Sequence, residues 1–132
     1  MITGVNHITI AVSDLDASLA FYVDLLGMLP KVRWDRGAYL TAGDIWLCLT
    51  LDKPKPAEDY SHIAFSISKK DFADLSQRLT ESEAIQWQPN TSEGDSLYIL
   101  DPDGHKLEFH LGDLESRLNH LKHNPYPGLH WY

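Results

Sequence analysis

The amino-acid sequence predicts an α+β fold built from two βαβββ modules within one domain. An internal repeat is the main observation: residues 6–13 and 61–68 align with His, Ile and Ser in common, and both have the pattern of a strand. In each copy a helical pattern of apolar residues follows, and then two strand-like stretches joined by a turn. A chain of 132 residues has room for a single domain, spanning residues 1–132.

The first module covers about residues 1–51. Its first strand leads into a helix that Ser13 or Asp14 can cap, because either side chain can accept a hydrogen bond from a free backbone N–H group. Apolar residues recur at helical spacing over 15–26, and Gly27 ends the helix. Further strands are expected near 30–34 and at 37–41 and 45–51, with a turn at Gly43 and Asp44.

The second module covers about residues 61–111 and follows a linker at about 52–60, which contains two prolines. Ser68 can cap its helix, and the apolar residues Phe72, Leu75 and Leu79 have helical spacing. The remaining strands are expected near 84–87 and at 95–100 and 105–111, with a type I turn at 101–104.

The C-terminal tail, residues 112–132, lies outside the repeat. Asp113 can open a short helix with Leu114, Leu118 and Leu121 on one face, and the prolines at 125 and 127 stop it. Residues 128–132 are mainly apolar and aromatic. We therefore expect the end of the tail to pack on the body of the chain or on a partner chain.

Composition and charge exclude several classes of protein. A net charge of −8 leaves no basic face for nucleic acid, and no apolar run approaches the roughly 18 residues of a membrane span. The first residues lack the charge order of a signal peptide, so a cytoplasmic location is expected. Cys48 is the only cysteine, which excludes an intramolecular disulfide and a four-cysteine zinc site.

Two histidines and one glutamate form a candidate metal site. His7 and His62 occupy the same position in the two copies of the repeat, and Glu108 lies among apolar residues of a strand. An unpaired carboxylate is costly to bury, and a divalent metal would compensate its charge. The alternative is that each histidine is satisfied by ordinary hydrogen bonds. The other histidines are interpreted as surface or structural residues, although one shares a strand face with Glu108: His105, His110, His120, His123 and His130.

Other polar residues also have two readings. Thr9 shares a strand face with His7, where its hydroxyl could position a substrate oxygen or simply be a strand threonine. Arg117 is either a bidentate anion clamp or part of a surface ion pair. The polar segment 90–96 could surround a monovalent cation or be an ordinary loop. Core or sheet packing is the simpler reading of four aromatic residues: Tyr39, Trp46, Tyr60 and Tyr98.

Several sequence blocks are specific enough to indicate a family. Residues 34–39 are Trp-Asp-Arg-Gly-Ala-Tyr and residues 92–96 are Ser-Glu-Gly-Asp-Ser, with further matching blocks at 4–9, 45–49 and 100–108. Together they resemble the FosA-type fosfomycin resistance glutathione transferases of the vicinal oxygen chelate superfamily, nearly from end to end. The resemblance implies the glyoxalase/bleomycin resistance/dioxygenase fold and a homodimer that exchanges modules between chains.

The resemblance also implies an activity and its cofactors. It implies a metalloenzyme that transfers glutathione to the oxirane of fosfomycin, which opens the epoxide and inactivates the antibiotic. Manganese, or another divalent metal, is implied at His7 of one chain with His62 and Glu108 of the other. Fosfomycin, glutathione and a second copy of the chain are the implied partners, with no nucleic acid or membrane. Potassium is implied as an activator at Asn90, Ser92, Gly94 and Ser96.

Individual residues take roles from the same resemblance. Thr9 matches a hydroxyl beside the reacting oxygen, and Tyr39 matches a residue near the thiol, so both are candidate catalytic residues. The implied substrate-binding residues are Trp46, Tyr60, Gln88, Ser92, Tyr98 and Arg117.

The chain departs from the family pattern at two positions. Gln88 stands where these enzymes usually carry Lys, and Thr91 stands where they commonly carry Arg. The alternatives are therefore an enzyme of the same fold that acts on another phosphonate or epoxide, or one that uses another thiol or water. A metal-free binding protein of the same fold is a further alternative. An extradiol dioxygenase is not favoured, because these enzymes of the superfamily need a longer chain and a further acid–base residue, and this sequence offers neither.

Overall fold

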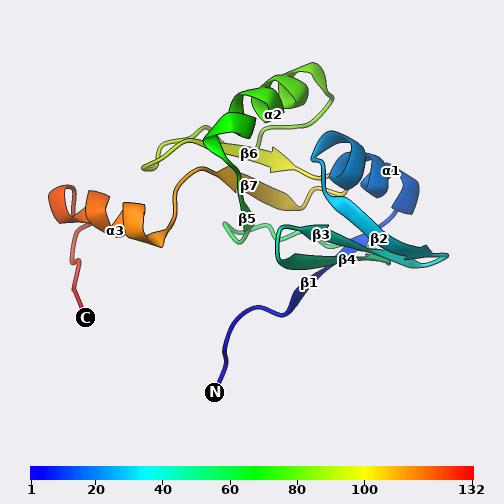
Figure 1. Cartoon of the computed structure of the whole chain (residues 1–132), viewed down its shortest axis with the longest axis horizontal. Helices are drawn as coiled ribbons and strands as arrows, with labels where there is room; N and C mark the ends of the chain where they lie inside the picture. Colours follow the sequence, from blue (N-terminus) through cyan, green and yellow to red (C-terminus); the bar gives the residue numbers. More distant parts are fainter.

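Two β-sheets, each accompanied by a helix, form the body of the computed structural model, which describes residues 1–132 (Figure 1). The first sheet has the order β1-β4-β3-β2 and comprises β1 (His7–Val12), β2 (Leu29–Trp34), β3 (Gly37–Ala42) and β4 (Ile45–Leu51). The second has the order β5-β7-β6 and comprises β5 (Ile63–Ser66), β6 (Ser96–Leu100) and β7 (Lys106–His110). The helical elements are α1 (Leu15–Leu19), the π-helix η1 (Ala20–Leu25), α2 (Lys69–Glu81) and α3 (Leu114–His123).

The pairing of the strands confirms the internal repeat. In each module the first strand lies parallel to the last one, as β1 does with β4 and β5 with β7, and the preceding strand is antiparallel to the last. The expected fourth strand of the second module, at 84–87, is wrong, because Gln86 forms only an isolated bridge with Ile99. Pro89 has no N–H to donate, which keeps the pairing short at this edge.

The first helix begins at the predicted place but continues in a different form. Asp14, and not Ser13, is its cap, and the Asp14 carboxylate accepts a hydrogen bond from the Ala17 N–H at 3.1 Å. The second half, η1, is a π-helix that buries both Phe21 and Tyr22, although these are neighbours in sequence. The regular helical spacing of the sequence did not predict this widening. Gly27 ends the segment at φ 77°, as expected.

The helix of the second module matches the prediction. The Ser68 hydroxyl caps α2 by accepting a hydrogen bond from the Asp71 N–H at 3.1 Å. Leu75 and Leu79 are buried against Phe65 and its neighbours in the core. This amphipathic spacing places α2 over the second sheet (Figure 1).

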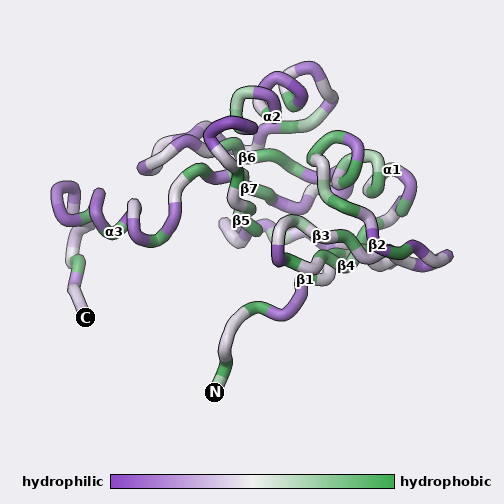
Figure 2. Tube along the Cα trace, viewed as in Figure 1, coloured by the Kyte–Doolittle hydropathy of each residue, from purple (hydrophilic) through white to green (hydrophobic).

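The C-terminal helix forms as predicted, but the end of the tail does not pack on the body of this chain. Asp113 and Ser116 make a capping box, and α3 ends just before Pro125. Only Leu121 of the expected leucine face is buried, whereas Leu114 is 73% exposed. Figure 2 shows α3 as largely hydrophilic and projecting away from both sheets. The end of the tail is also exposed, so packing on the body was a wrong expectation and packing on a partner chain stays a prediction.

One hydrophobic core joins the two modules. Leu47 and Leu49 of β4 belong to the same buried cluster as Leu107 and Phe109 of β7. None of the helices has both the length and the apolar character needed to cross a membrane.

Polar contacts also connect the modules within the chain. The Tyr22 hydroxyl donates to Asp101 Oδ2 at 2.7 Å, and the Ser13 hydroxyl donates to Asp103. His105 Nε2 lies 2.7 Å from the Ala11 carbonyl oxygen, which confirms a structural role for this histidine. Burial, with the nearby Asp101 carboxylate, raises the pKa of Tyr22, so its hydroxyl stays protonated as a donor.

Replacing Tyr22 by Phe should lower the free energy of unfolding by about 1–3 kcal/mol, because a buried carboxylate loses a hydrogen bond. Asp101 retains the bonds that its Oδ1 accepts from the N–H groups of Asp103 and His105, so the fold should persist. Urea unfolding measures the change. Tyr132→Phe, at a fully exposed position, is the matched control and should leave the midpoint unchanged. Equal midpoints for the two variants would contradict the prediction.

Candidate functional site

His62 and Glu108 form a close pair at one edge of the second sheet. His62 directly precedes β5 and Glu108 lies on β7, and the parallel pairing of these strands brings the two residues side by side. His62 Nε2 is 2.9 Å from Glu108 Oε2, and their side chains are only 19% and 10% exposed. His62 Nδ1 lies 2.8 Å from the carbonyl oxygen of Tyr60.

The hydrogen bonds around His62 favour a cation at this point. A carbonyl oxygen can only accept, so His62 Nδ1 carries a proton and donates it to Tyr60. In a neutral imidazole, Nε2 then presents a lone pair directly to the oxygen of Glu108. Two acceptors at this distance require either a further proton or a metal ion. A neutral imidazole and a carboxylate, with the outer ring nitrogen anchored, form a donor set that suits a divalent transition metal.

The Glu108 carboxylate is held in its ionised form. Burial alone would raise its pKa, but hydrogen bonds from Ser96 and Tyr98, together with the contact to His62, outweigh burial and lower the pKa below its usual value of 4.5. The Ser96 hydroxyl donates to Glu108 Oε1 at 2.7 Å. Oε2 is the oxygen that faces His62.

His110 belongs to this group, and the sequence analysis did not assign it a role. Its Nδ1 lies 2.5 Å from the Ser96 hydroxyl oxygen and 3.5 Å from Glu108 Oε1, and its side chain is 15% exposed. Of the two predicted interpretations of His110, surface or structural, the surface one was therefore wrong and the structural one agrees with these contacts. The signal was its place two residues from Glu108, on the same strand face.

A second group of predicted residues shares one face of the first sheet. The strand register places His7 beside Trp46, and Thr9 beside Cys48, whose other neighbour is Tyr39. The His7 ring lies 4.5 Å from the Trp46 ring, and Tyr39 packs edge-on against Trp46 at 5.0 Å between centroids.

His7 is anchored in the same way as His62. His7 Nδ1 lies 2.7 Å from the side-chain oxygen of Asn6, and the residue is exposed. The amide oxygen can only accept, so Nδ1 donates the proton and Nε2 is left with a lone pair.

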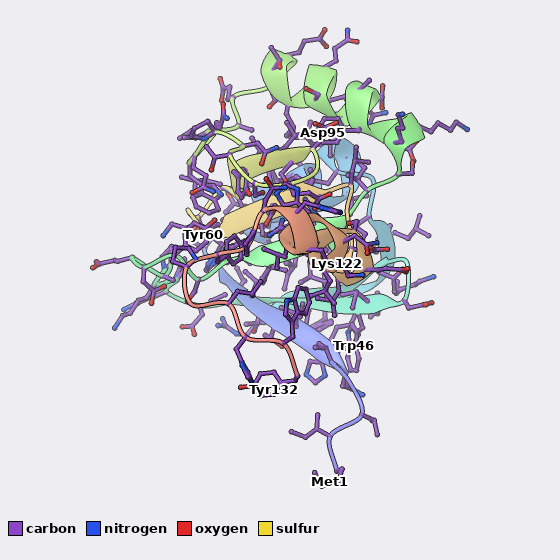
Figure 3. The ribbon with its side chains drawn as sticks, turned by 90° about the vertical axis from the view of Figure 1, so that its left-hand side faces the viewer. Met1, Trp46, Tyr60, Asp95, Lys122 and Tyr132 are labelled. Carbon is purple, nitrogen blue, oxygen red and sulfur yellow. The ribbon has the colours of Figure 1, made fainter.

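A single chain does not bring His7 to the other two candidate ligands. Nowhere in the chain do three or more His, Cys, Asp or Glu side chains gather closely enough to hold a metal. Figure 3 labels Trp46, beside His7, and Tyr60, beside His62, and the two lie on well-separated parts of the molecule. Within one chain, His7 therefore lies apart from the His62–Glu108 pair, and we refer to these two groups as the candidate half-sites.

Aromatic rings surround His62. The ring centroids of Tyr60, Trp87 and Tyr98 lie 4.9, 5.5 and 6.3 Å from that of His62. Trp87 was not among the predicted site residues, although it directly precedes Gln88. The Gln88 amide donates to the Tyr60 hydroxyl at 3.0 Å. A shallow, open depression lies beside Tyr60 and His62.

The segment 90–96 folds back on itself next to this group. The Asn90 side-chain amide donates to the carbonyl oxygen of Gly94 at 2.7 Å, and the Ser92 hydroxyl donates to the Asn90 side-chain oxygen at 3.2 Å. The Ser92 hydroxyl also lies 3.5 Å from that of Tyr98. These contacts bring Asn90, Ser92 and Gly94 together in one turn, while Ser96 points to Glu108.

The positively charged side chain of Arg117, on α3, contacts this segment. Its guanidinium contacts the Glu93 carboxylate at 3.4 Å and donates to the Glu93 carbonyl oxygen at 3.3 Å. The Tyr126 hydroxyl lies 3.5 Å from another guanidinium nitrogen. Glu93 and Tyr126 were not predicted, because nothing in the sequence shows that Arg117 of α3 reaches this loop or that Tyr126 contacts Arg117.

A family model named Glyoxalase/Bleomycin resistance protein/Dioxygenase superfamily matches residues 4–109, which include both half-sites. The chain belongs to this superfamily.

Within the glyoxalase/bleomycin resistance/dioxygenase superfamily, its relatives include Fos proteins, which confirms the FosA-type resemblance. The chain is 48% identical to "Glutathione transferase FosA" of Serratia marcescens, over 98% of this chain and 95% of the relative. It is 42% identical to "Metallothiol transferase FosB" of Staphylococcus haemolyticus, over 92% and 93%.

Solved structures of superfamily members agree with the fold. The fosfomycin resistance protein FosX of Listeria monocytogenes, complexed with Mn(II) and sulfate ion, is 28% identical, with a TM-score of 0.80 and coverage of 91% of this chain and 98% of that one. FosX of Mesorhizobium loti is 31% identical, with a TM-score of 0.78 and coverage of 89% and 99%. The predicted paired-module fold is therefore confirmed.

Proposed function

We propose that this chain is a metal-dependent transferase that joins glutathione to fosfomycin. The observation that carries the proposal is the part-buried His62–Glu108 pair, whose facing nitrogen and oxygen need either a further proton or a metal ion between them, in a chain 48% identical to a glutathione transferase. In this reaction the thiolate sulfur forms a bond to an oxirane carbon and the carbon–oxygen bond breaks. The released oxygen takes a proton, and the product is an open, inactive thioether.

The proposed metal is manganese, held by His62 and Glu108 of one chain and His7 of a second chain. The anchored Nδ1 atoms of both histidines support this, since each leaves Nε2 available. The Mn(II) of the FosX complex is a further support. Such an ion stabilises the negative charge that develops on the oxirane oxygen. The proposed assembly is a homodimer with exchanged modules, because one chain holds only half-sites.

The chain's own residues would bind and orient the two substrates. We assign Arg117, Ser92, Tyr98 and Gln88 to the phosphonate, because an anion needs local donors in a protein of net charge −8. Thr9 would donate to the reacting oxygen, and Tyr39 would lie near the thiol. Trp46 and Tyr60 would form the wall around the oxirane. A potassium ion is proposed at Asn90, Ser92, Gly94 and Ser96.

The cytoplasm is the proposed location, because glutathione is abundant there and keeps thiols such as Cys48 reduced.

Product analysis tests the proposed transfer of glutathione to fosfomycin. Purified protein loaded with Mn(II) is incubated with fosfomycin, glutathione and potassium, and mass spectrometry identifies the adduct. We expect the thioether. A diol would indicate that water is the nucleophile, and adducts with other thiols in the same assay would show a different co-substrate. Unchanged fosfomycin under all conditions would overturn the proposal.

Replacing Gln88 by Lys should raise kcat/KM for fosfomycin by roughly 2- to 30-fold. A charge-assisted hydrogen bond to the phosphonate contributes about 1.5–3 kcal/mol, against about 1 kcal/mol for a neutral one. The gain should be absent with an uncharged epoxide, which is measured in parallel. Lower fosfomycin turnover, at normal folding and metal content, would indicate that Gln88 contacts a different natural substrate.

A further inference from the structure

Three side chains of the second module form a buried series of hydrogen bonds that ends at Glu108. The Ser96 hydroxyl oxygen is 2.7 Å from Glu108 Oε1 and 2.5 Å from His110 Nδ1. Ser96 and Glu108 are buried, and the His110 side chain is 15% exposed. Ser96 lies opposite His110 in the antiparallel pairing of β6 and β7, so the backbone fixes this arrangement.

The numbers of donors and acceptors determine where the protons lie in this series of hydrogen bonds. The Ser96 hydroxyl has one proton, and the ionised Glu108 can only accept, so Ser96 donates to Glu108 Oε1. The Ser96 oxygen must then accept from His110 Nδ1–H. A protonated His110 Nδ1 cannot accept the Ser96 proton, so this proton stays directed at Glu108 Oε1, and Oε2 of Glu108 is left for His62.

Two glycines hold the His110 ring in this orientation. A Cβ atom at Gly94 would lie 2.9 Å from His110 Cε1, and one at Gly112 would lie 2.5 Å from His110 Nε2. Both separations are far below a van der Waals contact, so the ring fills the space that the missing side chains leave. Gly94, at φ 78°, is also where the segment 90–96 turns back.

We propose that His110 is a positioning residue, which acts through the Ser96 hydroxyl to hold Glu108 with Oε2 directed at the metal. This inference rests on the proposed metal site, and it adds a residue that contacts neither metal nor substrate. Outer hydrogen-bond partners of metal ligands typically contribute 10- to 100-fold to metal affinity.

The test measures Mn(II) affinity, by electron paramagnetic resonance of free Mn(II), at a fixed potassium concentration and in the absence of substrate. His110→Phe keeps the ring but removes the donor, and we expect about tenfold weaker binding. His110→Asn retains an N–H group near the position of Nδ1, and it should restore most of the affinity. His105→Phe is the matched control, because it removes a half-buried histidine bonded to a distant carbonyl. Equal Mn(II) affinity of wild type and His110→Phe would overturn the inference, as would an Asn variant no better than Phe.

A double-mutant cycle tests whether His110 acts through Ser96. If it does, Ser96→Ala with His110→Phe should bind Mn(II) no more weakly than Ser96→Ala alone. Losses that add would overturn the assignment. The outcome is separable from that of the proposed function: wild-type protein that binds Mn(II), shows the His110 effect and forms no fosfomycin adduct would refute the activity alone.

Discussion

Glu108→Gln should lose most of its metal affinity and nearly all of its turnover. The amide keeps the shape of the side chain and can still accept from Ser96, but it removes the negative charge that would pair with the cation. We expect metal binding to weaken at least about 100-fold, beyond the range for outer partners, and kcat to fall by roughly 10²–10³. Mn(II) titration and an adduct assay measure the two effects.

The matched control for Glu108→Gln is Glu115→Gln, an equal change of charge at an exposed position on α3. This variant should match wild type in both assays. Wild-type metal content and turnover in Glu108→Gln would remove Glu108 from the metal site, whatever the role of His62.

Mixing two inactive variants should restore activity if the half-sites come from different chains. In a mixed dimer of His7→Ala and His62→Ala, one site would combine the intact His7 of one subunit with the intact His62 of the other. Random pairing makes about half of the dimers mixed, with one of two sites intact, so about a quarter of wild-type activity should return. The adduct assay follows the recovery after subunit exchange.

Two controls define this experiment. Native mass spectrometry verifies that mixed dimers form, and each variant mixed with itself should stay inactive. No recovery despite verified exchange would contradict a site shared between chains, and it would require His7 to reach His62 within one chain.

Local patterns in the sequence predicted most of the secondary structure. Asp14, Ser68 and Asp113 cap the helices because a side-chain oxygen beside the first turn can accept from an unpaired N–H group, a contact between near neighbours in sequence. The repeat predicted two βαβββ modules, whereas the parallel pairing of the first and last strand in each module came from the structure. Where a feature depends on distant packing, as in the π-helix η1 or the missing strand near 84–87, the same reasoning failed.

For the candidate site, too, the sequence predicted some features and missed others. The positions of His7, His62 and Glu108 followed from the repeat and from the residues that matched a family. Their surroundings did not, because the partners of His110, Arg117 and Trp87 come from other elements, brought together only by folding.

The sequence by itself determined the paired modules, the caps and the candidate metal ligands, because periodicity, repeat position and residue chemistry act over short stretches or recur in copies. Only the tertiary structure decided that His62 Nε2 faces Glu108, that Ser96 and His110 support that carboxylate, and that His7 lies apart in a single chain. The contacts among these residues span 12 to 46 positions in the sequence, from Ser96–Glu108 to His62–Glu108, and their geometry depends on how the sheets and the core pack together.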